Sequence, residues 1–247
     1  MIKIKTISIL GSGWLGLPLA KELSQTYKIN LSTRTQEKKE NLESSSINAF
    51  LIDTDMIDEK ISNFLQSDIL IINIPSKNID GFRELIQQIL SSNIKRVIFI
   101  SSTSVCHNTE SPLKKIEELF QNTDIKTTIL RFGGLIGYSR NPANFFKNGK
   151  IVKNPNAPVN MIHRDDCIGI INEVIRQDMF DEVFNCCSPS HPTKKEFYTQ
   201  CANFANLEIP AFDTVDDMEM FRVINSDKLI SQLNYKFIYS DLMKVKF

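Results

Sequence analysis

Gly11-Ser12-Gly13-Trp14-Leu15-Gly16 directly follows the apolar run Ile7-Ser8-Ile9-Leu10. The glycines have the spacing G-x-G-x-x-G, and residues 15–23 carry apolar side chains at helical intervals. A glycine motif of this form is weak evidence by itself, but between a strand and a helix it is typical of a dinucleotide-binding loop. The stretch therefore predicts the first βα unit of a parallel sheet, with a pyrophosphate site at the turn.

Each of the three motif positions requires glycine for a different physical reason. Gly11 permits the tight turn after the strand, Gly13 lets a pyrophosphate approach the backbone, and Gly16 allows close packing of helix on strand. The free N–H groups of the loop, at Trp14 and Leu15 among others, then face the phosphates together with the helix dipole. The alternative is a glycine-rich turn in an α/β protein that binds no dinucleotide.

Segments typical of strands and helices alternate over the first half of the chain. We expect strands at 7–10, 29–33, 49–52, 69–72, 97–100 and 127–130, and helices at 15–23, 36–42, 57–65, 82–90 and 113–120. The run Ile69-Leu70-Ile71-Ile72 is continuously apolar, as in a strand covered on both faces. With right-handed crossovers, this order predicts an α/β fold of the Rossmann type, a doubly wound parallel sheet with helices on both faces.

The regular alternation ends after the sixth expected strand, where glycines and X-Pro pairs gather. A helix resumes near Asp165, whose side chain is suited to cap it. Residues 183–187 are expected to return to the sheet as one more strand. We therefore expect residues 1–133 to form a dinucleotide-binding core, and residues 134–247 to form a smaller C-terminal portion that covers the substrate.

The composition excludes several classes of protein. Lys plus Arg and Asp plus Glu both number 29, so there is no global charge that would attract nucleic acid or an anionic membrane. The five cysteines are odd in number and include no C-x-x-C pair, which argues against a disulfide framework or a zinc site and favours a reducing compartment. Lys3 and Lys5 before an apolar run resemble a secretory signal, but Gly11, Gly13 and Pro18 interrupt that run. We expect a cytoplasmic protein with no metal, no membrane segment and no nucleic-acid partner.

The end of the second expected strand bears on the choice between NAD and NADP. An acidic residue there would accept hydrogen bonds from the adenosine ribose. This chain has Arg34 and Thr35 instead, and no acid comes before Glu37. Arg34 is suited to pair with a 2′-phosphate, and the hydroxyl of Ser32, Thr33 or Thr35 is suited to donate to it. The sequence favours NADP(H) over NAD(H), and the alternative for Arg34 is a solvated surface charge.

Further motifs follow the glycine loop in a fixed order. They are Asn73-Ile74-Pro75, Ser101-Ser102-Thr103-Ser104-Val105, Leu130-Arg131-Phe132-Gly133-Gly134, Asn160-Met161-Ile162-His163-Arg164-Asp165-Asp166, and a C-terminal stretch at 225–235. This order resembles the extended and atypical short-chain dehydrogenase/reductases of the NAD-dependent epimerase/dehydratase superfamily. The resemblance covers nearly the whole chain. It implies a nicotinamide coenzyme, a nucleotide-sugar or small carbonyl substrate, and a homodimer that pairs the helices near 82–90 and 113–120.

The resemblance also implies which residues contact the coenzyme. Asp53, at the end of the third strand, is similar to the residue that meets the adenine amino group. The segment Asn73-Ile74-Pro75 lies where the fourth strand passes the coenzyme. Ser101 is similar to the coenzyme-contacting residue after the fifth strand.

The catalytic part of the resemblance is incomplete. The family uses a Tyr and a Lys four residues later for proton transfer, and such general acid–base catalysis contributes about 10²–10⁴-fold. Ser102 and Thr103 match the hydroxyl that orients the substrate, and Lys114 matches the lysine. The tyrosine position, however, holds Glu110, and the tyrosine of the family's S-S-T-S-V-Y-G segment is Cys106.

Three residues are candidates to replace the missing tyrosine, namely His107, Tyr138 and Glu110. We assign Tyr138 to the catalytic set, because the loop after the sixth strand is suited to bring it to the site; plain packing is its alternative. Two functions stay open. One is an NADP(H)-dependent oxidoreductase or epimerase with a degenerate active site, and the other is a non-catalytic dinucleotide-binding sensor or scaffold.

Overall fold

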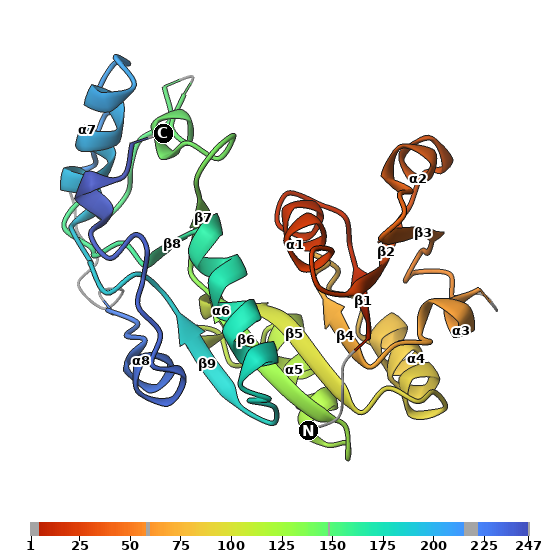
Figure 1. The fold of residues 1–247 in the computed structure, drawn as a ribbon. Coiled ribbons are helices and arrows are strands. Elements are labelled where there is room, and N and C mark those ends of the chain that lie inside the picture. The colour runs from red at the N-terminus through yellow and green to blue at the C-terminus, as the bar shows by residue number, and fades with distance from the viewer. Residues whose placement is uncertain (1–4, 58–59, 148, 215–221, 247) are drawn as a thin grey trace. The chain divides into compact units, whose positions relative to one another are not determined.

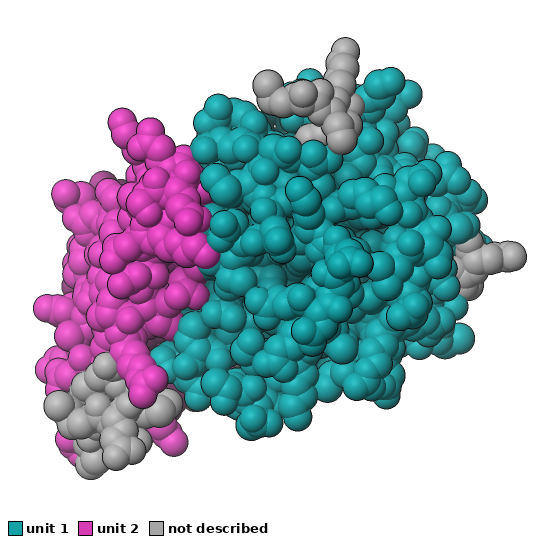
Figure 2. All heavy atoms as spheres, turned by 90° about the horizontal axis from the view of Figure 1, so that it is seen from below, with its two compact units in different colours: residues 1–131, 171–184 teal, residues 132–170, 185–247 magenta. Residues whose placement is uncertain are grey.

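The computed structural model describes residues 5–57, 60–147, 149–214 and 222–246. It divides into two compact units, coloured separately in Figure 2. The first unit spans Met1–Arg131 and Ile171–Phe184, and the second spans Phe132–Ile170 and Asn185–Phe247.

A seven-stranded sheet organises the first unit (Figure 1). Its strands are β1 (Thr6–Leu10), β2 (Lys28–Thr33), β3 (Ile47–Leu51), β4 (Ile69–Ile72), β5 (Arg96–Ser102), β6 (Lys126–Phe132) and β9 (Val183–Cys186), in the order β3-β2-β1-β4-β5-β6-β9. The pairs β1–β2, β2–β3, β1–β4 and β4–β5 are all parallel. The order reverses between β1 and β4, as in a doubly wound sheet. The predicted α/β fold class is confirmed.

Helices cover both faces of this sheet. They are α1 (Gly16–Leu23), α2 (Gln36–Leu42), α3 (Ile61–Phe64), α4 (Ile79–Leu90) and α5 (Pro112–Gln121), with a 3₁₀ turn at Thr103–Cys106 between β5 and α5. The first helix packs against β1 and β2, while α3, α4 and α5 pack against the opposite face (Figure 1). On that face Phe82, Phe99 and Phe120 lie with ring centroids 5.2–6.2 Å apart. Aromatic pairs at such spacing add stability beyond the area that they bury.

The apolar strand runs behave as the sequence predicts. Every residue of β4 is completely buried, as are Ile7 and Ile9 of β1. In α4 the buried residues Phe82, Leu85, Ile86 and Ile89 recur at helical spacing. The helix begins after Asn78, whose side chain accepts a hydrogen bond from the Gly81 N–H at 3.1 Å.

The second unit has a small sheet and its own core. Strands β7 (Gly134–Ile136) and β8 (Met161–His163) form a parallel pair. Helix α6 (Arg164–Arg176) begins directly after β8, and its residues from Ile171 onward belong to the first unit. Helices α7 (Lys194–Phe204) and α8 (Asp227–Leu233) follow later in the chain. Its apolar core consists of Ile136, Val152, Val159, Phe197, Tyr198, Cys201 and Leu242.

Some expected boundaries are wrong. The helix expected over 57–65 is Ile61–Phe64 in the described part of the chain. Asp165 does not cap α6, since the helix already begins at Arg164 and Asp165 lies in its first turn. The strands β7 and β8 were not expected at all.

The described part of the chain holds no helix with both the length and the apolar character needed to cross a bilayer. It also holds no cluster of three or more His, Cys, Asp or Glu side chains arranged to bind a metal ion.

Candidate functional site

The carboxyl ends of four parallel strands meet around a cavity of about 500 Å³ in the first unit. The lining residues follow β1, β2, β3 and β4 in turn: Leu10, Gly11, Ser12, Gly13, Ser32, Thr33, Arg34, Thr35, Lys38, Ile52, Thr54, Asp55, Asn73, Ile74, Pro75 and Ser76. The cavity thus lies where the strand order reverses between β1 and β4. Open α/β sheets bind their ligands at this point.

The glycine loop, residues 11–16, connects β1 to α1 and packs against the end of β4. Gly11 has φ +110°, and a Cβ there would overlap the carbonyl oxygen of Asn73. A Cβ on Gly16 would overlap the Gly11 carbonyl oxygen. The Gly11 N–H donates to the Ser32 hydroxyl at 2.8 Å, which ties the loop to β2. Gly11 and Gly16 are therefore required by the protein's own packing.

Gly13 is different, because nothing in the protein requires it to be glycine. It is exposed, and a Cβ placed on it would meet no protein atom within 4 Å. Gly13 itself lines the cavity and lies just before the start of α1. A helix N-terminus has N–H groups without intrahelical partners and a partial positive charge. The opening over Gly13 therefore suits an anionic group that approaches the backbone closely.

Basic side chains stand on the β2 side of the cavity. Arg34 is exposed, and Thr35 precedes α2 in an extended conformation with φ −123°. Lys38, in the first turn of α2, donates from its Nζ to the Ser12 carbonyl oxygen at 2.6 Å. Lys38 was not predicted, although its position four residues after Arg34 was visible in the sequence.

The β3 and β4 side of the cavity is more mixed. Asn73, Ile74 and Pro75 line it, and the Asn73 N–H donates to the Leu10 carbonyl at 2.9 Å. Thr54 and Asp55 also line it, whereas Asp53 is exposed outside the lining. The adenine contact assigned to Asp53 stays a prediction.

A buried carboxylate lies behind the end of β5. Glu117 of α5 is completely buried and accepts a hydrogen bond from the Ser101 hydroxyl at 2.6 Å. Arg131 of β6 binds the same carboxylate through two nitrogens, at 2.6 Å and 3.0 Å. The hydrogen bond to Glu117 is the main reason that the pKa of Arg131 lies above its usual value. The Ser101 hydroxyl thus binds a buried carboxylate of the protein itself. The cluster of Ser101, Glu117 and Arg131 joins β5, α5 and β6.

The residues assigned to catalysis in the first unit make local contacts. The Ser102 hydroxyl accepts the Ser104 N–H at 3.2 Å and caps the 3₁₀ turn, and Thr103 is buried. Lys114 places its Nζ 3.2 Å from Glu118 and 3.9 Å from Glu117. Neighbouring carboxylates thus hold the ammonium group of Lys114.

Tyr138 belongs to the second unit. Its backbone has φ +55°, an uncommon value for a bulky residue, and its side chain is 56% exposed. The hydroxyl donates to the Asp165 carboxylate at 2.9 Å, and the Arg164 guanidinium lies 3.7 Å above the ring. Burial lowers the pKa of the neighbouring His163, whose Nδ1 accepts the Asp165 N–H at 3.2 Å. The catalytic role of Tyr138 stays a prediction.

Comparison with known proteins places this geometry among proteins of one fold. No family model matches the chain. Over 272 residues it is 29% identical to protein YeeZ of Escherichia coli K12, covering 96% of this chain and 97% of YeeZ. A candidate NAD-dependent epimerase/dehydratase of Methylobacillus flagellatus superposes with a TM-score of 0.75 at 21% identity, covering 97% of this chain and 95% of that one. The dTDP-glucose 4,6-dehydratase of Bacillus anthracis, solved with NAD, gives 0.77 at 13% identity, with 97% and 94% covered. The chain has the epimerase/dehydratase fold.

The epimerase/dehydratase fold brings together only part of the predicted site. Around the cavity lie Gly11, Gly13, Arg34, Thr35 and the Asn73–Pro75 segment. Outside the lining are Trp14, Leu15, Gly16, Asp53, Ser101, Ser102, Thr103, Lys114 and Tyr138. The lining residues that sequence reasoning missed include Ser12 and Lys38. Glu117 was also missed, although a carboxylate on the apolar face of the helix expected at 113–120 was a visible signal.

Proposed function

We propose that the first unit binds NADP(H) in the cavity at the carboxyl ends of β1–β4. One observation carries the proposal: Gly13 has open space where a side chain would fit, in the lining of a cavity at the switch point of the sheet. A diphosphate fills that space and uses the N–H groups at the start of α1. Asn73, Ile74 and Pro75 then lie along the coenzyme where it passes β4.

Arg34 and Thr35 decide the form of the coenzyme in this proposal. Arg34 is exposed at the cavity and pairs with the 2′-phosphate of NADP(H), and the Thr35 hydroxyl donates to the same group. The B. anthracis dehydratase, which shares the fold, was solved with NAD. The experiment below therefore measures binding of both NADPH and NADH.

Substituting Arg34 by alanine tests this choice. Loss of a charge-assisted contact weakens NADPH binding by about 1.5–3 kcal/mol and leaves NADH binding unchanged. Isothermal calorimetry of the wild type and the variant with both coenzymes measures the difference. Arg176→Ala, in an ion pair with Glu173 on α6, is the matched control. Equal effects on both coenzymes would contradict the role of Arg34, and a wild type that binds neither would contradict the proposed function.

The same fold also supports a proposal for the class of reaction. The proposed substrate is a nucleotide sugar or small carbonyl compound, as supported by the dTDP-glucose dehydratase that shares the fold. The coenzyme supplies or accepts a hydride. Ser102 and Thr103 orient the substrate oxygen, and Lys114 supports proton transfer.

A non-catalytic sensor or scaffold is the second candidate. It is favoured by the position of Lys114, whose ammonium group lies beside two carboxylates, and by Glu110 at the tyrosine position. The two candidates differ in turnover: the sensor binds NADPH and exchanges no hydride with a broad panel of carbonyl compounds and nucleotide sugars. The five free thiols in the described residues support a reducing compartment, the cytoplasm, for either candidate.

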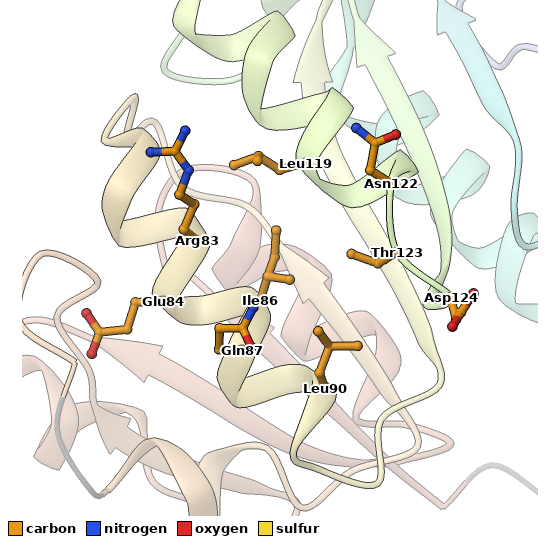
Figure 3. A pocket seen from close by; sticks show the side chains of 9 residues that line it. All are labelled: Arg83, Glu84, Ile86, Gln87, Leu90, Leu119, Asn122, Thr123 and Asp124. Carbon is orange, nitrogen blue, oxygen red and sulfur yellow. The ribbon is translucent and has the colours of Figure 1, made fainter.

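The proposal includes a homodimer. A groove of about 580 Å³ runs between α4 and α5, and Figure 3 shows its lining side chains. Leu90 at its end is 45% exposed, and the half-buried Leu119 adds apolar surface. A second copy of the chain covers this surface in the dimer.

A further inference from the structure

Lys38 lines the coenzyme cavity but belongs to none of the sequence motifs. It lies in the first turn of α2, and its Nζ donates to the Ser12 carbonyl oxygen at 2.6 Å. This partly buried contact joins residues 26 positions apart. Ser12 is the second residue of the glycine loop, so the ammonium group is held at the loop that receives the pyrophosphate in the proposed function.

Arg34, Thr35 and Lys38 form one basic corner of the cavity. They fall within five consecutive residues and all line it. The Thr35 side chain makes no capping bond to α2, which leaves its hydroxyl available to a ligand. Among the described residues, no carboxylate forms an ion pair with Arg34 or Lys38. The Asp55 carboxylate also lines the cavity, but it accepts a hydrogen bond from the Asn78 side chain at 2.9 Å.

The present partner of Lys38 is a weaker acceptor than a phosphate. The ammonium group of Lys38 is charged, but the backbone carbonyl that it binds is neutral. A phosphate is an anion, so it adds the direct attraction of opposite charges to the hydrogen bond. A phosphate that enters the basic corner therefore draws the ammonium group away from Ser12. A ribose hydroxyl in the same place carries no charge and leaves the Lys38–Ser12 bond intact.

We propose that Lys38 is a specificity-determining residue that exchanges the Ser12 carbonyl for the 2′-phosphate of the coenzyme. Lys38 then binds the phosphate together with Arg34 and Thr35. This inference rests on the proposed binding of NADP(H) and adds a second cation to it. The ligand class is a nucleotide that carries a phosphomonoester on its adenosine ribose.

The test compares Lys38→Met with Lys39→Met. Lys39 is the next residue of α2, pairs with Glu43 at 4.0 Å and lies outside the cavity lining, so it is a matched control. Calorimetry measures NADPH, NADH, 2′,5′-ADP and 5′-AMP against each full-length protein. We expect Lys38→Met to weaken NADPH and 2′,5′-ADP about tenfold and to leave NADH and 5′-AMP unchanged. Lys39→Met should leave all four affinities unchanged.

Thermal unfolding of each variant shows whether the protein still folds without the Lys38–Ser12 bond. If Lys38→Met does not fold, Lys38→Gln removes the charge but retains an amide donor, and the same affinity pattern is expected. Equal losses for NADPH and NADH, or no loss for either, would overturn the role of Lys38 and leave coenzyme binding intact. A wild type that binds none of the four probes would instead overturn the proposed function.

Discussion

Gly11, Gly13 and Gly16 belong to one motif, but the reason for glycine differs among the three positions. A Cβ on Gly11 or Gly16 would overlap a backbone oxygen of the protein itself. A Cβ on Gly13 would meet only open space. At the scale of single residues, the motif therefore separates into two positions that serve the fold and one that, in the proposed function, serves the ligand.

Gly13→Val is expected to leave the fold intact and to abolish coenzyme binding, because the new side chain occupies the space that the pyrophosphate needs. Thermal unfolding and NADPH calorimetry check the two halves of this statement. Gly16→Val is the contrasting variant, and overpacking against the Gly11 carbonyl should cost at least about 1–3 kcal/mol of stability. An unchanged NADPH titration in a folded Gly13→Val protein would refute the assignment.

Helix α5 is fixed to two strands at once through its buried carboxylate. Glu117→Gln breaks the paired charges of Glu117 and Arg131 and weakens the bond to Ser101. Since the Arg131 side chain is still 18% exposed, we expect a loss near the lower end of the range for such pairs, about 3 kcal/mol. Urea unfolding measures it. Glu118→Gln, the adjacent exposed position, should stay within about 0.5 kcal/mol, and equal effects of the two variants would contradict this role.

The sequence predicts elements well where a periodic pattern is long. The strands of the parallel sheet were predicted from continuously apolar runs such as residues 69–72, which are apolar because helices cover both faces of the sheet. The strands β7 and β8 have three residues each, too few for a period to be visible. Lys38 and Glu117 were missed for another reason: their importance lies in contacts with Ser12 and Arg131, which are distant in the chain.

Assembly is the prediction that belongs to the whole molecule. If a second copy covers the groove between α4 and α5, Leu90→Lys should convert a dimer into a monomer, because it places a charge in an apolar contact. Light scattering should then report a fall from twice the chain mass to 28.2 kDa. Ile238→Lys, at a position 63% exposed in the second unit, is the control. A wild type that is already monomeric, or a Leu90→Lys protein that stays dimeric, would contradict the arrangement.

The sixteen described residues that line the cavity of the first unit all fall between positions 10 and 76 of the chain. Less than a third of the polypeptide therefore encodes that cavity, in four successive crossings from strand to helix. In the proposed function, substitutions after position 76 can therefore change the contacts with the substrate while every described residue of the cavity lining stays the same.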